Sequence, residues 1–173
     1  IDAFDGVCDG DKRVAGFAHE AGRACVIVVN KWDLVSEQKM KRFAEDVHAQ
    51  LPFLSYAPVV FTSAVTGLGV GAAVDTALNA AANSVMRVST GELNRIVQDA
   101  IDAHPYARKG RDLRVRYVTM SGVKPPTIVL FVNNPELAHF SYIRYLENRI
   151  RQAYAYEGTP LRLVVRRAKK VRE

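Results

Sequence analysis

Two uninterrupted apolar runs in the first half of the 173-residue chain restrict its fold more than any other feature. Residues 24–29 (Ala-Cys-Val-Ile-Val-Val) and 58–62 (Pro-Val-Val-Phe-Thr) have the length of strands and lack polar alternation, which is typical of strands buried on both faces. Between them, Met40, Phe43 and Val47 recur at the spacing of a helix. This order predicts a parallel sheet with right-handed crossovers, in which ligands bind at the carboxyl ends of the strands.

Further helical patterns flank both runs. An apolar stripe that contains Val14 and Phe17 ends at Gly22, and residues 69–86 form a helical stretch rich in Ala and Val. Ser36 is the expected N-cap of the helix between the two runs. The first half is therefore expected to be an α/β unit in which strands and helices alternate.

The second half has a different pattern and predicts a small α+β domain with the order α-β-β-α-β. Two helices are expected on one side of a three-stranded sheet. The first helix carries Leu93 and Val97 in its apolar stripe, with Ser89 or Thr90 as its N-cap and Glu92 in its first turn. The expected elements are this helix, strands at 113–120 and 127–132, a helix that begins at 133–135 and ends at Gly158, and a strand at 161–165.

Charge divides the chain at the same place as the element pattern. Residues 1–88 carry 8 Lys and Arg against 10 Asp and Glu, whereas residues 89–173 carry 16 against 8. We therefore expect two domains, 1–88 and 89–173, of which the second is strongly basic. The sequence shows no membrane-spanning run, no secretory signal, and no disulfide or metal pattern among its two Cys and four His, which favours a protein of the cytoplasm.

The sharpest motif, Asn30-Lys31-Trp32-Asp33, directly follows the first apolar run, where a parallel strand places its ligand loop. The Asp33 carboxylate can accept two hydrogen bonds from adjacent N–H groups, which guanine has and adenine lacks. A buried acceptor rejects a ligand without these donors, because the carboxylate would be left unpaired. Asn30 can bond a ring nitrogen and neighbouring loops, and the stem of Lys31 can lie flat over a base.

A second motif, residues 62–69 (Thr-Ser-Ala-Val-Thr-Gly-Leu-Gly), follows the next apolar run. Its glycines permit a turn, and its small side chains let the backbone approach a planar ligand closely. The N–H of Ala64 can donate to a carbonyl oxygen, and Ser63 can orient Asp33. Alone, this loop is more typical of a helix N-cap, but two motifs after successive strands favour a guanine site. Its candidate residues are Asn30, Lys31, Asp33, Ser63 and Ala64.

These motifs resemble the guanine-recognition elements Asn-Lys-x-Asp and Ser-Ala of the translation-factor-like P-loop GTPases. The whole chain resembles the C-terminal part of the Der (EngA) family of bacterial tandem-G-domain GTPases, which is the end of the second G domain followed by a KH-like domain. In the second half the resemblance is carried by Arg111-Asp112-Leu113, Pro125-Pro126-Thr127, Phe131-Val132-Asn133, residues 141–151 and residues 158–166. The resemblance implies a cytoplasmic GTPase that binds GTP and GDP and acts in assembly of the large ribosomal subunit.

Two motifs of such a GTPase are missing from the sequence. It contains neither a Gly-x-x-x-x-Gly-Lys-[Ser/Thr] phosphate loop nor an Asp-x-x-Gly switch, so the Mg²⁺ ligands that the family implies are absent as well. We therefore expect a C-terminal fragment that recognises guanine, contacts upstream G domains and does not hydrolyse GTP alone. The alternative is a non-enzymatic adaptor that binds RNA or the ribosome and keeps a vestigial nucleotide fold.

The basic half contains candidate contacts to rRNA, although it lacks the Gly-x-x-Gly loop by which RNA-binding KH domains clamp a backbone. Basic side chains attract phosphate in a salt-sensitive way, but they also occur on solvated faces or on surfaces that dock against an acidic G domain. The candidates are Arg108, Lys109, Arg111, Arg166, Arg167, Lys169 and Lys170. Residues 166–172 are expected to be a frayed tail. Tyr142, Tyr145, Tyr154 and Tyr156 recur at helical spacing and are expected to pack rather than to stack on bases.

Overall fold

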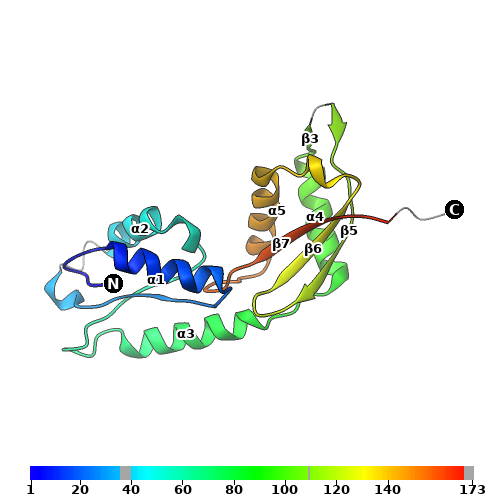
Figure 1. The fold of residues 1–173 in the computed structure, drawn as a ribbon. Helices are drawn as coiled ribbons and strands as arrows, with labels where there is room; N and C mark the ends of the chain where they lie inside the picture. The colour runs from blue at the N-terminus through cyan, green and yellow to red at the C-terminus, as the bar shows by residue number, and fades with distance from the viewer. Residues whose placement is uncertain (36–39, 109, 170–173) are drawn as a thin grey trace. The chain divides into compact units, whose positions relative to one another are not determined.

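The computed structural model describes residues 1–35, 40–108 and 110–169 and divides the chain into two compact units (Figure 1). The first unit comprises Ile1–Val85 and Tyr156–Pro160, and the second comprises Met86–Ala155 and Leu161–Glu173. The chain therefore returns to the first unit for a short stretch between two elements of the second. Nothing in the charge or hydropathy pattern indicates this return.

The first unit is built on two parallel strands, as predicted. Its elements are α1 (Asp9–Glu20), β1 (Ile27–Val29), the 3₁₀ turn η1 (Trp32–Leu34), α2 (Met40–Gln50), the 3₁₀ turn η3 (Pro52–Leu54), β2 (Val59–Phe61) and α3 (Val70–Ser84). The two strands pair with Val29 opposite Phe61. The first residues of the chain run beside β1, where Asp2 forms a parallel bridge with Asn30. The carboxyl ends of β1 and β2 therefore lie next to each other.

The core of the first unit lies on the side of the sheet that faces α1 and α2 (Figure 1). Trp32 and Val47 are almost fully buried there, and Phe43 packs against them, which confirms the predicted stripe of α2. The stripe of α1 is different, because Val14 and Phe17 are exposed. Helix α1 therefore contributes less to this core than its pattern predicts.

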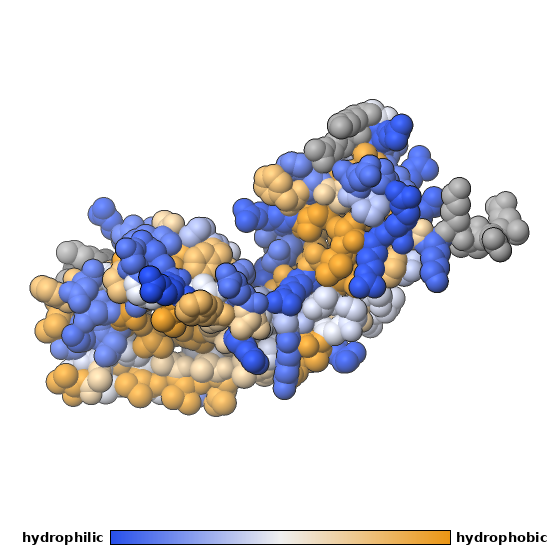
Figure 2. Space-filling view, viewed as in Figure 1, coloured by the Kyte–Doolittle hydropathy of each residue, from blue (hydrophilic) through white to orange (hydrophobic). Residues whose placement is uncertain are grey.

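Helix α3 lies on the opposite side of the sheet and leaves an apolar band open. It buries Ala80, but Val70, Val74 and Leu78 are exposed. Figure 2 shows this band as apolar surface along α3. Ser36, the predicted N-cap of α2, lies outside the described residues.

Residues 156–160 are tightly held in the first unit. The Gly158 carbonyl accepts a hydrogen bond from the Cys25 N–H, and the Gly158 N–H donates to Tyr56, both at 2.8 Å. The Thr159 hydroxyl donates to the Ala80 carbonyl at 2.8 Å, and the Thr159 side chain has no exposed surface. This short segment thus joins the chain before β1, the chain before β2 and helix α3.

The second unit has helices on one side of a three-stranded sheet, as predicted (Figure 1). Its elements are α4 (Thr90–Ala103), β3 (Ala107–Arg108), β4 (Arg111–Asp112), β5 (Val115–Gly122), β6 (Thr127–Val132), the 3₁₀ turn η4 (Pro135–Leu137), α5 (Phe140–Ala153) and β7 (Arg162–Arg167). The strand order is β5-β6-β7, with the first pair antiparallel and the second parallel. Ser89 and Glu92 form a capping box at the start of α4.

The inner face of this sheet packs against the two helices. Leu130 at the centre of β6 is fully buried, as are Leu93 of α4 and Leu146 of α5. The hydroxyl of Tyr142 donates to the backbone carbonyl of His104 at 3.0 Å, and that of Tyr145 donates to the backbone carbonyl of Ala100 at 2.9 Å. Both tyrosines thus tie α5 to α4, which confirms their predicted packing role.

Three boundaries in the second unit differ from the prediction. The helix expected from 133–135 is only the turn η4, which Asn134 caps, and α5 begins at Phe140 after a separate cap from His139. Helix α5 ends at Ala153 rather than at Gly158. The last strand continues through Arg167, because its backbone stays paired with β6 to the end of that strand.

Among the described residues, no helix is both long and apolar enough to span a membrane.

Candidate functional site

Trp32 anchors the loop that follows β1. Its side chain is 1% exposed and lies against Phe61, with 4.3 Å between the ring centroids. Its backbone N–H donates to the Thr62 carbonyl at 3.0 Å, which ties this loop to the loop after β2. Because Trp32 is turned into the core, the side chains of Lys31 and Asp33 on either side of it are exposed.

The carboxylate of Asp33 is exposed in the first turn of η1. Within the part of the chain that the structure describes, it has no hydrogen bond or ion pair. A carboxylate has two oxygens that accept hydrogen bonds, so Asp33 can receive two parallel N–H groups without first breaking a contact to another described residue.

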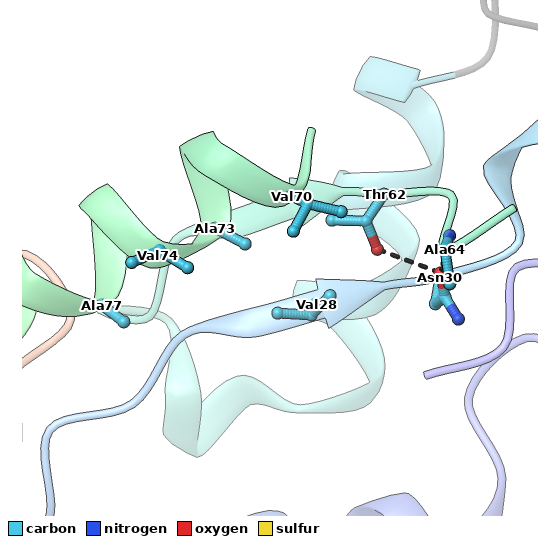
Figure 3. A pocket seen from close by; sticks show the side chains of 8 residues that line it. All are labelled: Val28, Asn30, Thr62, Ala64, Val70, Ala73, Val74 and Ala77. Carbon is cyan, nitrogen blue, oxygen red and sulfur yellow. Dashed lines mark hydrogen bonds between the residues drawn. The ribbon is translucent and has the colours of Figure 1, made fainter. Parts of the chain in front are cut away.

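Asn30 joins the two loops. Its Oδ1 accepts a hydrogen bond from the Ala64 N–H at 3.1 Å and another from the Thr62 hydroxyl at 3.2 Å, the second drawn as a dashed line in Figure 3. Its Nδ2 has no hydrogen-bond partner among the described residues and can donate to a ligand. The structure thus brings Asn30 and Ala64 together at the ends of the two strands.

A cavity of about 440 Å³ opens beside this contact (Figure 3). Asn30, Thr62 and Ala64 form its polar end, and the remainder is the apolar surface between β1 and α3. Its lining residues are Val28, Asn30, Thr62, Ala64, Val70, Ala73, Val74 and Ala77. Lys31, Asp33 and Ser63 are not part of this lining.

Ser63 has a structural role in the loop after β2. It is fully buried, and its hydroxyl accepts a hydrogen bond from the Thr66 N–H at 3.2 Å. The hydrogen bonds between described residues include none from Ser63 to Asp33, which differs from the expected orienting role.

Gly69 has φ of +68°, and an added Cβ there would overlap the Phe61 carbonyl, so this turn requires glycine.

Lys31 is held by Asp2, which is not among the predicted site residues. Its Nζ lies 2.6 Å from Oδ2 of Asp2, and its backbone has φ of +65°. The other oxygen of Asp2 accepts a hydrogen bond from the Phe4 N–H at 2.9 Å. The hydrogen bond from Lys31 lowers the pKa of Asp2, and the same bond raises the pKa of Lys31, so both groups are charged near neutral pH. The only signal for Asp2 in the sequence is its position in an Ile-Asp-Ala segment.

The candidate RNA contacts have different positions. Arg111 lies in β4, opposite Arg108 of β3. Arg166 and Arg167 belong to strand β7 rather than to a frayed tail, and both are exposed, as is Lys169. Arg167 donates to Oδ1 of Asn134 at 3.3 Å. Lys109 and Lys170 lie outside the described residues.

The described residues contain no group of three or more His, Cys, Asp and Glu side chains that could hold a metal ion. No residue of the described part is therefore assigned to Mg²⁺. Cys8 and Cys25 are both free thiols, and burial raises the pKa of Cys25.

Two family profiles match the chain. The profile of the elongation factor Tu GTP-binding domain matches residues 1–104, and that of the C-terminal KH-domain-like region of the EngA bacterial GTPases matches residues 87–166. The chain belongs to the family of GTP-binding domains that the first profile defines. Its resemblance to the Der (EngA) GTPases is confirmed over the whole chain.

Individual Der GTPases show how far this similarity extends. The chain is 50% identical over 173 residues to the GTPase Der of Pelotomaculum thermopropionicum, covering 98% of this chain and 39% of that protein. It is 47% identical to the GTPase Der of Desulfitobacterium hafniense, covering 100% of this chain and 40% of that protein, and 46% identical to that of Listeria monocytogenes, covering 98% and 39%. The chain thus spans about two fifths of the length of these relatives.

Proposed function

We propose that the first unit recognises the guanine base of GTP and GDP and that the chain works as part of a cytoplasmic GTPase. The observation that carries this proposal is the exposed carboxylate of Asp33, which has no partner among the described residues and lies beside two loops joined by Asn30 and Ala64. Phosphates and Mg²⁺ are expected to be held outside this chain, because residues 1–173 contain no phosphate loop.

Base recognition would use each residue differently. The two oxygens of Asp33 accept from the N1 and N2 hydrogens of guanine, and adenine has no such pair of donors. Nδ2 of Asn30 donates to a ring nitrogen. The Ala64 N–H, which already donates to Asn30, is shared with the guanine carbonyl oxygen. Lys31 extends its stem along the base while its ammonium group stays on Asp2. Ser63 supports the loop that presents Ala64.

The test is the nucleotide specificity of the full-length protein that contains this chain. Asp33→Asn should lower the affinity for GDP about a hundredfold or more, because one carboxylate acceptor becomes an amide donor that faces the guanine amino group. The same variant should gain affinity for xanthosine diphosphate, whose ring carries a carbonyl in place of that amino group. Asp46→Asn on the exposed side of α2 is the matched control and should bind GDP normally.

Titration calorimetry separates this site from any second nucleotide site by its stoichiometry. The preference of Asp33→Asn for GDP over ADP is the deciding value. If it equals that of the unchanged protein, Asp33 does not read the base and the proposal fails.

For the second unit we propose a partner that carries phosphate, namely rRNA of the large ribosomal subunit. This proposal is supported by the charge of residues 89–173, which carry 16 Lys and Arg against 8 Asp and Glu. Among the candidate contacts, Arg111, Arg166, Arg167 and Lys169 are exposed and described. A role in ribosome assembly follows from this partner together with the similarity to the Der GTPases.

A further inference from the structure

The outer face of the three-stranded sheet carries a row of side chains that the site described above does not use. Tyr117 of β5 lies opposite Phe131 of β6, which lies opposite Arg166 of β7. Paired residues of neighbouring strands project from the same face of a sheet. Their neighbour Leu130 projects from the other face, where it is buried beneath the helices. We call Tyr117, Phe131 and Arg166 the stacking row.

The two aromatic rings of this row are already stacked on each other. Their centroids are 4.3 Å apart and their planes differ by 15°. Tyr117 is 46% exposed, and β5 is an edge strand with no described strand beyond it. Phe131 covers only one face of the Tyr117 ring, so a further planar group can continue the stack at the edge of the sheet.

The charge around the stacking row favours an anionic partner. Strands β5, β6 and β7 contain no Asp or Glu. The exposed Arg116 is the extra residue at a register shift between Val115 and Tyr117, so the regular alternation of faces is interrupted there and Arg116 lies next to Tyr117 on the edge strand. Arg166, at the other end of the row, is also exposed. Figure 2 shows the apolar surface over β6 and β7 bordered by hydrophilic side chains. Exposed aromatic rings between arginines are how proteins bind the unpaired bases and the phosphates of single-stranded nucleic acid.

We propose that the stacking row binds single-stranded RNA, with an unpaired base on the open face of Tyr117 and with Arg116 and Arg166 on the neighbouring phosphates. The inference rests on the RNA partner proposed above. It differs in assigning base contact to the sheet, whereas the other candidate contacts supply only phosphate attraction. A duplex cannot bind in this way, because its bases are already stacked.

The test uses the 173-residue chain and fluorescence anisotropy with two labelled probes, a single-stranded RNA of about eight nucleotides and a duplex of the same sequence. Tyr117→Leu should weaken binding of the single strand about tenfold and leave the duplex unchanged. Tyr117→Phe keeps the ring and should bind as the unchanged chain does. Phe140→Leu is the matched control, because Phe140 is an aromatic side chain 73% exposed on the helix layer.

The salt dependence of RNA affinity tests the role of Arg166. Arg166→Gln should reduce the slope of log affinity against log salt by about 0.7, the value for one phosphate contact on a single strand. Arg144→Gln, an equal loss of charge from an exposed position on α5, should leave the slope unchanged. Circular dichroism of each variant shows whether the fold is retained.

Two results would overturn the inference, and they are distinguishable from failure of the proposed function. If Tyr117→Leu and Phe140→Leu bind the single strand equally well, RNA binds elsewhere and only the stacking row is wrong. If neither probe binds the unchanged chain at low salt, the RNA partner is wrong as well, and a protein would be the better candidate for this face. Neither result bears on the nucleotide specificity of Asp33.

Discussion

Substitution of Gly158 by Ala tests whether residues 156–160 belong to the folded first unit. Gly158 has φ of +71°, a conformation that costs a residue with a side chain about 1–2 kcal/mol. The added Cβ would overlap Cβ of Ala80 and lie 3.3 Å from the Cys25 carbonyl oxygen, and overpacking of this kind costs about 1–3 kcal/mol. Together these effects should lower the free energy of unfolding of the first unit by about 2–5 kcal/mol.

Urea unfolding followed by tryptophan fluorescence measures this loss. Trp32 is the only tryptophan of the 173 residues and is buried in the first unit, so its emission reports on that unit. Gly16→Ala in α1 is the control, because an added Cβ there meets nothing within 4 Å and should add up to about 1 kcal/mol of stability. If Gly158→Ala unfolds at the same urea concentration as the unchanged chain, the segment is not packed as described.

Two further substitutions probe single contacts. Asp2→Asn removes the charge that holds Lys31 and should lower the affinity of the full-length protein for GDP a few-fold, whereas the exposed Asp9→Asn should not. Equal calorimetric affinities for these two variants would contradict a positioning role for Asp2. Burial raises the pKa of Tyr142 to about 12, so the stability that its neutral hydroxyl contributes is complete below about pH 10 and is lost as the pH rises towards 12. Tyr142→Phe should therefore be less stable than the unchanged chain near pH 8, with a smaller difference near pH 11, and a constant difference in urea unfolding would refute this.

The proximity of Asn30 and Ala64 could be predicted because it depends on topology alone. Two apolar runs separated by a helix imply parallel strands, and parallel strands bring Asn30 and Ala64 to the same edge. The expectation that both strands are buried on both faces is wrong, because Val28 of β1 and all three residues of β2 are only half-buried. The hydrogen-bond partner of each side chain could not be predicted from topology. Ser63 and Asp33 follow the correct strands, but the Ser63 hydroxyl turns back to the Thr66 N–H. Whether the Ser63 hydroxyl bonds the Thr66 N–H or the Asp33 carboxylate depends on small differences in loop conformation, which the spacing of residues in a sequence does not encode.

Periodicity likewise predicts that a residue is buried better than it predicts which unit the residue is buried in. Tyr156 continues the spacing of Tyr142 on α5 and is 1% exposed, yet the helix ends at Ala153 and Tyr156 belongs to the first unit. Since an apolar residue less than one turn beyond a helix end can keep the same spacing, the pattern does not reveal that the chain has moved to another core.

The geometry of strand β7 also changes the interpretation of the basic residues Arg166 and Arg167. A tail would present Arg166 and Arg167 to solvent as one charged patch, but consecutive residues of β7 project from opposite faces of the sheet. Arg166 therefore joins the row of Phe131 on the outer face, and Arg167 reaches Asn134 near the start of η4. Because only one of the two arginines shares a face with the aromatic stack, Arg166→Gln and Arg167→Gln should differ in RNA affinity although they remove the same charge.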